Sequence, residues 1–428
     1  MARSTTDLDG SDIQHTAPGV ALSWDVARRA CYDVGHAGLL SASEVPVGDC
    51  DGMTLADGIR ALSDLPAFPT STVDGWAVRG PAPWRIGTQV LAGMVAAPIG
   101  ADGICVQIAT GAMVPADTEA ILRVEDSKIH DGLVSGTPRT EREWRLPGDE
   151  AHEDDVLVPA GTVVTPAIIG LAAATGHDTL RVRARPVAVS LVFGDELLTA
   201  GLPADGRIRD SLGPQLPAWL RRLGVQSTTP SVIGPIDDTL DAHVAAIREA
   251  QSSGADLILT TGGTMHGPVD HLHAALATLG ATYAVNTVEV RPGFPMLLAT
   301  LPRPDGGTTL LAGLPGNPQS AIVALVSLVI PALTGLAGRK LDPLPTTRLG
   351  GPVPGRGEYT HLALVRRDAD GDAWPLAHAA SSMLRGLAQA VGFAVIVPET
   401  SGAPGDQVPF VPLPIFAETE KFSEGAAG

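Results

Sequence analysis

Three carboxylates stand where two predicted strands end, and their chemistry gives the first indication of a site. Asp195 and Glu196 follow the apolar run 187–193 after a single glycine, Gly194, and Asp270 closes a glycine-rich loop that follows the apolar run 257–261. Carboxylates that converge in this way suit a hard cation such as Mg²⁺, which binds few protein oxygens and keeps phosphate oxygens as further ligands. The same positions suit N-caps of the helices that follow, and Asp238, before another predicted helix, allows both roles. The spacing alone leaves both interpretations open.

Two glycine-containing loops strengthen the case for a ligand site. In both loops, 257–270 and 314–320, a glycine turn follows an apolar run. A helix-like run comes after each loop. This order is typical of a parallel α/β sheet, in which ligands bind beyond the carboxyl ends of the strands. Glycines there let a ligand approach the backbone, and bare amide groups attract anions. We therefore predict a pocket for an anionic small molecule, although simple tight turns would also use glycines.

The composition excludes several classes of protein. The chain has 428 residues and a formal net charge of −18, and lysine occurs only at positions 128, 340 and 421, so a broad nucleic-acid surface is not expected. The Lys of a P-loop and the Gly-x-Gly-x-x-Gly of a dinucleotide site are both missing. The three cysteines have no paired metal spacing and fit a reduced cytosol. The polar N-terminus lacks an apolar signal core, and the longest apolar run, 321–333, contains Pro331 and is too short to span a bilayer. We expect a cytoplasmic protein with no membrane span.

The order of predicted elements indicates a multi-domain α/β chain. Strands over 187–193 and 257–261 belong to a central doubly wound, mostly parallel sheet domain over 185–340. Short β-like runs between glycines and prolines predict an inserted β-rich lobe over 62–148. Residues 19–61 and 149–184 are expected to form a linking domain, and 341–414 a β-barrel-like C-terminal module. Residues 1–18 are expected to be disordered and 415–428 to be a tail.

Six motifs, spread over roughly residues 22–414 in one order, resemble the molybdopterin molybdenumtransferase family, which includes MoeA and the gephyrin E domain. Residues 65–77, Leu-Pro-Ala-Phe-Pro-Thr-Ser-Thr-Val-Asp-Gly-Trp-Ala, are similar to the family's Pro-x-Phe-x-x-Ser-x-Met-Asp-Gly-Tyr-Ala. Residues 108–115 and 261–270 resemble its Ile-Met-Thr-Gly-Ala-x-x-Pro and Ser/Thr-Gly-Gly-x-Ser-x-Gly-x-x-Asp. Gly-Asp-Glu-Leu at 194–197 and Leu-Pro-Gly-Asn-Pro at 314–318 match, and Arg-Pro-Gly-Phe-Pro at 291–295 is similar to Lys-Pro-Gly-Lys-Pro.

The resemblance implies both a fold and an activity. The family has an elongated multi-domain chain and forms a homodimer, in which the lobe of one subunit faces the pocket of the other. It binds adenylylated molybdopterin, releases AMP with Mg²⁺, and inserts molybdate into the dithiolene. The positions that match catalytic ones are Asp195, Glu196, Asp270 and Thr110, with Asp195, Glu196 and Asp270 as Mg²⁺ ligands. The positions that match substrate-binding ones are Asp74, Asp238, Gly262, Gly263, Arg291, Pro315, Gly316, Asn317 and Ser320.

Five departures from the family pattern reduce the polar or cationic capacity of the expected site. Phe294 replaces a Lys, Met265 a Ser, Leu212 an Asn, and Gln107 and His361 each an Arg. Charged hydrogen bonds contribute about 1.5–3 kcal/mol each, so the expected pocket binds its anion more weakly than in the family. On this interpretation Phe294→Lys should tighten binding.

Three functions remain open from the sequence. The first is molybdopterin molybdenumtransferase. The second is a catalytically weak, gephyrin-like scaffold that binds a protein partner, which the depleted pocket motivates. The third, a molybdopterin adenylyltransferase, is disfavoured because the lobe and the C-terminal module follow the transferase order.

Overall fold

The computed structural model describes residues 21–264 and 271–415. The expected disordered segment 1–18, the tail beyond residue 415 and the positions Met265 and Asp270 lie outside this range. The chain forms two compact units, residues 1–42 with 183–428 and residues 43–182. The lobe expected over 62–148 falls within the second unit, whereas the expected linking domain is divided: residues 43–61 and 149–182 belong to the second unit, and residues 19–42 and 183–184 belong to the first.

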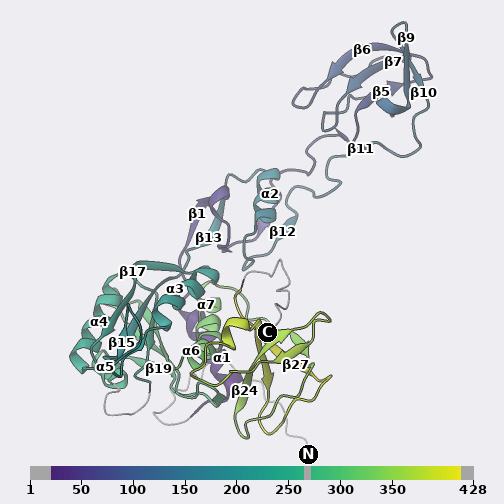
Figure 1. Cartoon of the computed structure of the whole chain (residues 1–428). Coiled ribbons are helices and arrows are strands. Elements are labelled where there is room, and N and C mark those ends of the chain that lie inside the picture. Colours follow the sequence, from purple (N-terminus) through teal and green to yellow (C-terminus); the bar gives the residue numbers. More distant parts are fainter. Residues whose placement is uncertain (1–20, 265–270, 416–428) are drawn as a thin grey trace, which may run out of the picture. The chain divides into compact units, whose positions relative to one another are not determined.

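The central domain of the first unit is built on a six-stranded sheet of order β17-β14-β18-β22-β21-β19 (Figure 1). The first four strands run parallel, whereas β21 and β19 are antiparallel to their neighbours. The antiparallel edge follows from the short connection between β21 and β22, which permits only a hairpin. The strands are β14 (Val187–Phe193), β17 (Gln226–Ile236), β18 (Leu257–Thr261), β19 (Thr282–Val285), β21 (Leu297–Pro302) and β22 (Thr308–Leu314). The bounds predicted for β14 and β18 are confirmed.

Helices cover both faces of this sheet, because residues that alternate along a strand point to opposite sides. Ala188 of β14 packs in a cluster with α1, α3 and the helix that follows β22, whereas Val189 and Leu191 pack in a second cluster with α4 and α5. The doubly wound arrangement is thus confirmed. The helices are α1 (Trp24–Ala37), α3 (Leu212–Arg222), α4 (Leu240–Ser252), α5 (Leu272–Thr278), α6 (Pro318–Ala324) and α7 (Ile330–Leu336), and two short strands, β15 (Leu197–Leu198) and β16 (Ile208–Arg209), pair between β14 and α3.

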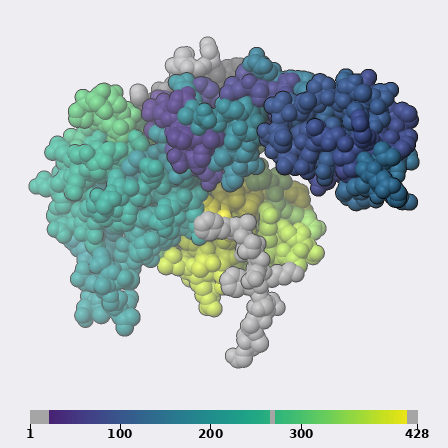
Figure 2. Space-filling model, turned by 90° about the horizontal axis from the view of Figure 1, so that it is seen from above, coloured from purple at the N-terminus to yellow at the C-terminus, as the bar shows by residue number. Residues whose placement is uncertain are grey.

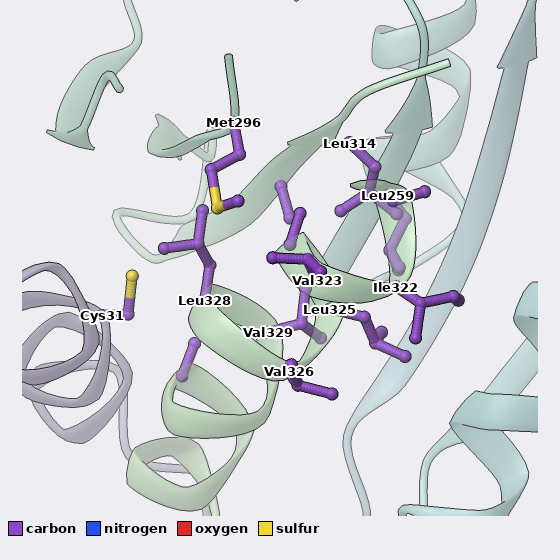
Figure 3. Packing of buried hydrophobic residues seen from close by; sticks show 14 of the residues in the cluster. Cys31, Leu259, Met296, Leu314, Ile322, Val323, Leu325, Val326, Leu328 and Val329 are labelled. Atoms are coloured by element: carbon purple, nitrogen blue, oxygen red, sulfur yellow. The ribbon is translucent and has the colours of Figure 1, made fainter. Parts of the chain in front are cut away.

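One continuous apolar helix forms the centre of the first unit. It joins α6, the π-helical segment η3 (Leu325–Val329) and α7. Figure 3 shows its side chains, among them Ile322, Val326 and Leu328, packed with Leu259 of β18 and Cys31 of α1. The helix has 19 residues and is longer than the apolar run suggested. Its length and its mean hydropathy of 1.9 would by themselves let it cross a membrane, but 89% of its most apolar stretch is buried inside the protein. It is a core helix.

The C-terminal module is a sheet of order β20-β24-β26-β27-β23, with β25 paired to β24. Figure 2 shows this module, in yellow, against the teal central domain of the same unit. Strand β20 comes from the central domain, so the pairing of β20 with β24 joins the two parts. The end of β23 continues into Leu349, which forms a parallel bridge to Ala373 of β25, and β25 pairs with β24, so the strands return on themselves as a barrel-like module does. The elements are β20 (Val290–Arg291), β23 (Thr346–Arg348), β24 (Thr360–Arg367), β25 (Ala373–Pro375), η4 (Leu387–Gln389), β26 (Gly392–Ile396) and β27 (Gln407–Pro412).

The second unit contains small sheets and one helix. Its largest sheet has the order β8-β5-β7-β6-β10-β9, and both faces are covered, since Ala77 and the neighbouring Trp76 pack in different apolar clusters. A three-stranded sheet β1-β13-β2 packs with α2, and the pairs β11-β4 and β12-β3 connect the elements. The strands are β1 (Ala42–Pro46), β2 (Thr54–Leu55), β3 (Ile59–Arg60), β4 (Thr70–Ser71), β5 (Gly75–Arg79), β6 (Trp84–Val90), β7 (Ile104–Ile108), β8 (Ala120–Arg123), β9 (Ser127–His130), β10 (Leu133–Gly136), β11 (Trp144–Arg145), β12 (Val156–Val158) and β13 (Thr179–Arg183). The helical elements are η1 (Val47–Asp49), η2 (Val124–Asp126) and α2 (Pro166–Ala174).

A bidentate ion pair joins the end of β8 to the residue that precedes β11. Arg123 Nε and Nη2 donate to the two carboxylate oxygens of Glu143 at 2.7 and 2.9 Å, and Glu143 is buried. The hydrogen bonds from Arg123 hold the pKa of Glu143 below its usual range. Because the folded pKa lies below the unfolded one, the pair stabilises the lobe above the unfolded value of about 4.3 and stops doing so as the pH falls through the folded pKa.

We expect Glu143→Gln to lower the thermal unfolding midpoint at neutral pH and to flatten its decline in acid, because the titrating partner of Arg123 is gone. Circular dichroism melts at a series of pH values measure both effects. The exposed neighbour Glu141 supplies the control, since Glu141→Gln should leave the midpoint and its pH dependence unchanged. Parallel pH curves for wild type and Glu143→Gln would contradict this account.

Candidate active site

The carboxyl ends of three neighbouring parallel strands bring the predicted loops together. Val192 pairs with Thr261, and Thr261 pairs with Leu314, so β14, β18 and β22 end at the same edge of the sheet. A Cβ added to Gly262 would lie 3.7 Å from the Phe193 carbonyl oxygen, and one added to Gly316 would lie 3.8 Å from the Gly262 Cα. The loops that begin at residues 194, 262 and 315 are therefore adjacent, as the sequence predicted.

Asp195 and Asp238 face each other across the ends of β14 and β17. The Asp238 amide donates to Asp195 Oδ1 at 3.3 Å, and the Asp195 amide donates to Asp238 Oδ2 at 3.4 Å. Neither residue is a helix cap: Thr239 caps α4 with its side chain, and α3 begins only at Leu212. The capping interpretation was therefore wrong for both, and two carboxylates are held close together at the edge of the sheet.

Glu196 follows Asp195 in the chain, but its side chain lies against Gly194. Gly194 has a φ of +136°, and a Cβ on it would come within 2.5 Å of Glu196 Oε2, so the carboxylate folds over the glycine backbone. Within residues 21–264 and 271–415, no group of three or more His, Cys, Asp or Glu side chains is arranged to hold a metal. The third predicted ligand, Asp270, lies outside the described residues.

The first glycine loop differs from the prediction in one respect. Gly262 and Gly263 have φ values of +84° and +67°, which favour glycine. The amide of Gly262 is however not bare, because it donates to the Leu314 carbonyl oxygen at 2.9 Å and so ties the two loops together. Gly262 therefore forms the turn and lets a ligand approach the backbone closely, but its amide is already bonded to Leu314 and does not bind the ligand.

His243, which the sequence did not single out, lies directly behind the glycine loop. Its ring stacks on Phe193 with centroids 3.8 Å apart, and Nδ1 donates to the Thr239 carbonyl oxygen at 2.8 Å. Burial lowers its pKa, so the ring is neutral and supports the loop from below. The sequence does not reveal that His243 supports this loop, because only the fold places α4 against β14.

A cleft of about 550 Å³ opens where the central domain meets the C-terminal module. It collects Arg291, Asn317 and Ser320, which the sequence had selected from separate motifs. Asn317 precedes α6 but its side chain makes no capping bond. The first amides of α6 are not free for a ligand either, since Gln319 and Ser320 both donate to the Ser381 carbonyl oxygen at 3.0 and 3.4 Å.

The cleft also contains residues that the sequence did not select as ligands. These are Arg356, Tyr359, His361 and Ser381 from the C-terminal module. The signal that brings them in is the pairing of Arg291 with His361 in the β20–β24 ladder, and a single sequence does not reveal such a register. Because two arginines and several hydroxyl and amide groups line one cleft, it suits an oxyanion.

A second pocket, of about 390 Å³, lies beside Asp195. Asp237 and Arg207 line it together with Leu197 and Leu198. Arg207 donates from Nη2 to the Leu197 carbonyl oxygen at 2.9 Å, so β15 and β16 form one wall. The carboxylates of the strand ends thus border a cavity large enough for part of a ligand.

In the second unit, Asp74 and Thr110 form one hydrogen-bonded group. The amide and the hydroxyl of Thr110 both donate to Asp74 Oδ1, at 2.6 and 2.9 Å, and these bonds lower the pKa of Asp74. A pocket of about 300 Å³ adjoins them and includes Gln107. Thr110 is thus fixed by Asp74, and its hydroxyl proton is directed to that carboxylate.

The departure at Leu212 lies outside any pocket described above. Leu212 is the first residue of α3 and is buried in the core, and its amide donates to Asp210 Oδ1 at 2.9 Å. Leu212, which replaces the family's Asn, is therefore a packing residue of the core.

Comparison with known proteins shows which family the chain belongs to. Residues 22–176 match the MoeA N-terminal region (domain I and II), and residues 190–335 match a probable molybdopterin binding domain. The molybdopterin molybdenumtransferase of Bacillus subtilis is 31% identical over 296 residues, which are 65% of this chain and 67% of the relative. That of Staphylococcus aureus is 29% identical over 297 residues, covering 66% and 69%.

Solved structures agree in fold. The molybdopterin biosynthesis MoeA protein of Pyrococcus horikoshii OT3 superposes with a TM-score of 0.73 at 18% identity, covering 91% of this chain and 99% of that one. A second MoeA structure from the same species has a TM-score of 0.72 at 22% identity. From the two matched regions, the relatives and the strand-end loops, we conclude that the chain belongs to the MoeA family of molybdopterin molybdenumtransferases.

Proposed function

We propose that this protein is a molybdopterin molybdenumtransferase: it takes adenylylated molybdopterin and molybdate, releases AMP, and acts in the cytoplasm in molybdenum cofactor biosynthesis. One observation carries the proposal. The family's motif residues at the ends of β14, β18 and β22 lie together at one edge of the sheet, beside a cleft lined by arginines. The names of its relatives support the same activity.

The adenylylated substrate is proposed to bind over the strand-end loops. Gly262, Gly263 and Gly316 leave room for it to approach the backbone, because no Cβ stands in the way. Pro315 and Asn317 shape the neighbouring loop, and Asp74 with Thr110 would contact the substrate from a partner subunit. The second pocket, beside Asp195 and Arg207, has room for a further part of the same ligand.

We propose that Asp195, Glu196 and Asp270 hold Mg²⁺, with Asp238 beside them. The paired carboxylates of Asp195 and Asp238 fit a cation, since two like charges so close together are stabilised by a positive partner. When bound, Mg²⁺ would place positive charge beside the oxygens of the phosphoanhydride that breaks. The chain itself supplies carboxylates at the sheet edge and an adjoining pocket lined by Asp195, Asp237 and Arg207.

Molybdate is proposed to bind in the cleft between the central domain and the C-terminal module. Arg291 and Arg356 would supply charge, and Asn317, Ser320 and Ser381 would supply hydrogen bonds. A doubly charged tetrahedral oxyanion matches this set better than an uncharged ligand does.

We expect molybdate to bind more tightly as the pH falls toward the pKa of His361. This side chain lines the cleft, burial lowers its pKa, and Nδ1 donates to the Pro354 carbonyl oxygen, so the ring is neutral at neutral pH. Protonation adds a positive charge facing the anion. Titration calorimetry over the pH range below about 6.5 measures the effect. His361→Gln should bind molybdate with an affinity that no longer changes there, and an unchanged pH dependence in that variant would contradict the assignment.

We propose a homodimer, and helix α2 supplies the support. It is made only of apolar residues, yet Ala167, Gly170 and Ala173 are exposed in the single chain. We propose that a second copy of the chain covers this apolar face of the helix.

We expect Ala173→Glu to shift the protein from dimer to monomer at micromolar concentration, because it would bury a charge at the interface. Light scattering coupled to size-exclusion chromatography measures the mass. Ala245→Glu, at an exposed position of α4, is the matched control and should remain dimeric. A monomeric wild type would count against the dimer, and a dimeric Ala173→Glu would move the interface away from α2.

Complementation tests the activity as a whole. A strain that lacks its own molybdenumtransferase is supplied with this protein, and nitrate reductase activity is measured. Rescue is expected. Failure with a soluble, dimeric product would favour the second candidate, a scaffold for a protein partner, for which the replacement of a cation by Phe294 is the motivating observation.

A further inference from the structure

The Arg291 guanidinium contacts two aromatic rings that line the same cleft. Its Cζ lies 4.2 Å from the centroid of the Tyr359 ring and 5.0 Å from that of Phe294. The two rings stand nearly perpendicular, at 86°, with centroids 5.7 Å apart. A guanidinium placed over two ring faces is attracted by both, and its plane is restrained.

The backbone explains how these three side chains meet. Arg291 of β20 pairs with His361 of β24 in a parallel ladder, and Tyr359 lies just before β24, where its ring meets the Arg291 guanidinium. Gly293 has a φ of +107°, which turns the chain and returns Phe294 toward the same cleft. The contact therefore depends on residues about 70 positions apart in the sequence.

We propose that Phe294 and Tyr359 are positioning residues that clamp the Arg291 guanidinium, so that its fork meets the oxyanion in one orientation. This inference rests on the proposed binding of molybdate in the cleft. A free arginine side chain loses considerable rotamer entropy when it binds an anion, whereas a clamped one has already lost it. Arginine offers two parallel N–H groups to an oxyanion, which a point charge does not.

The clamp changes the interpretation of Phe294. As a missing cation it would only weaken the pocket, and Phe294→Lys would strengthen it. As part of the clamp it orients the charge that remains. Phe294→Lys would remove a ring face and place an ammonium group beside the guanidinium, where like charges repel. The two interpretations therefore predict opposite signs for one substitution.

The test is calorimetric titration of the full-length protein with molybdate. Phe294→Leu and Tyr359→Leu should each weaken binding by about two- to fivefold, the effect of one cation–π contact. Tyr359→Phe should restore binding to near the wild-type value, since the ring face is kept. Arg291→Ala should weaken binding by about 10- to 150-fold. In the Arg291→Ala background, the ring substitutions should have no further effect on binding.

That loss of effect separates positioning from a general structural role, which would weaken binding in either background. Tyr283→Leu makes the same chemical change in β19, away from the residues that line the cleft, and should bind like wild type. If Tyr359→Leu does not fold, Phe294→Leu carries the same comparison.

Tighter binding by Phe294→Lys, or equal ring effects with and without Arg291, would overturn the clamp. Absence of molybdate binding in the wild type would overturn its role in oxyanion binding. Complementation distinguishes the two levels: rescue without ring coupling leaves the transferase standing and removes the clamp. Ring coupling without rescue does the reverse.

Discussion

Asp195→Asn is expected to lower the rate of AMP release from adenylylated molybdopterin by about 10²–10³-fold, the usual effect of removing one group that stabilises developing charge. Asparagine keeps the shape of the side chain and an oxygen that can still accept from the Asp238 amide. It removes the negative charge that a divalent cation needs. Thermal stability should be unchanged or slightly raised, because repulsion between Asp195 and Asp238 is relieved.

The measurement is AMP release at a series of Mg²⁺ concentrations, together with a thermal melt of each protein. Asp241→Asn, in the exposed first turn of α4, is the matched control and should release AMP at the wild-type rate. A variant at Asp195 that turns over normally at every Mg²⁺ concentration would remove Asp195 from the proposed metal site. A variant that loses stability instead would indicate a structural role for the carboxylate pair.

Gly335→Ala should lower the free energy of unfolding by about 1–3 kcal/mol, the usual cost of adding a methyl group to a closely packed contact. Helices α1 and α7 touch through backbone at this point. A Cβ on Gly335 would overlap the Tyr32 carbonyl oxygen, and one on Gly35 would overlap the Ala332 carbonyl oxygen. Neither obstacle is a flexible side chain, so the helices must move apart.

Urea unfolding of the first unit, followed by tryptophan fluorescence, measures the loss. Trp24 is a suitable reporter because it is buried on α1 and donates from Nε1 to Ser327 Oγ at 2.8 Å. Gly48→Ala is the control, because no heavy atom lies within 4 Å of the added Cβ. If Gly335→Ala were as stable as wild type, the close approach of α1 and α7 would not be needed for folding.

The local elements and the order of the functional motifs along the chain follow from the amino-acid sequence alone. The apolar runs 187–193 and 257–261 became β14 and β18 with those bounds, since a strand buried on both faces requires a continuous apolar run. Glycines after them predicted the turns, and the positive φ values of Gly262 and Gly263 follow from the absence of a Cβ. The order of motifs then indicated the family.

Which functional groups come into contact depends on the packing of the folded chain. The pairing of Asp195 with Asp238 and the clamp on Arg291 depend on strand register, which joins residues 43 and about 70 positions apart. The use of the Gly262 amide by Leu314 depends on the neighbouring strand in the sheet. Local propensity acts over a few residues, whereas register and helix packing are fixed by the burial of the whole core. The sequence therefore identifies the functional groups, whereas strand register and helix packing fix their geometry.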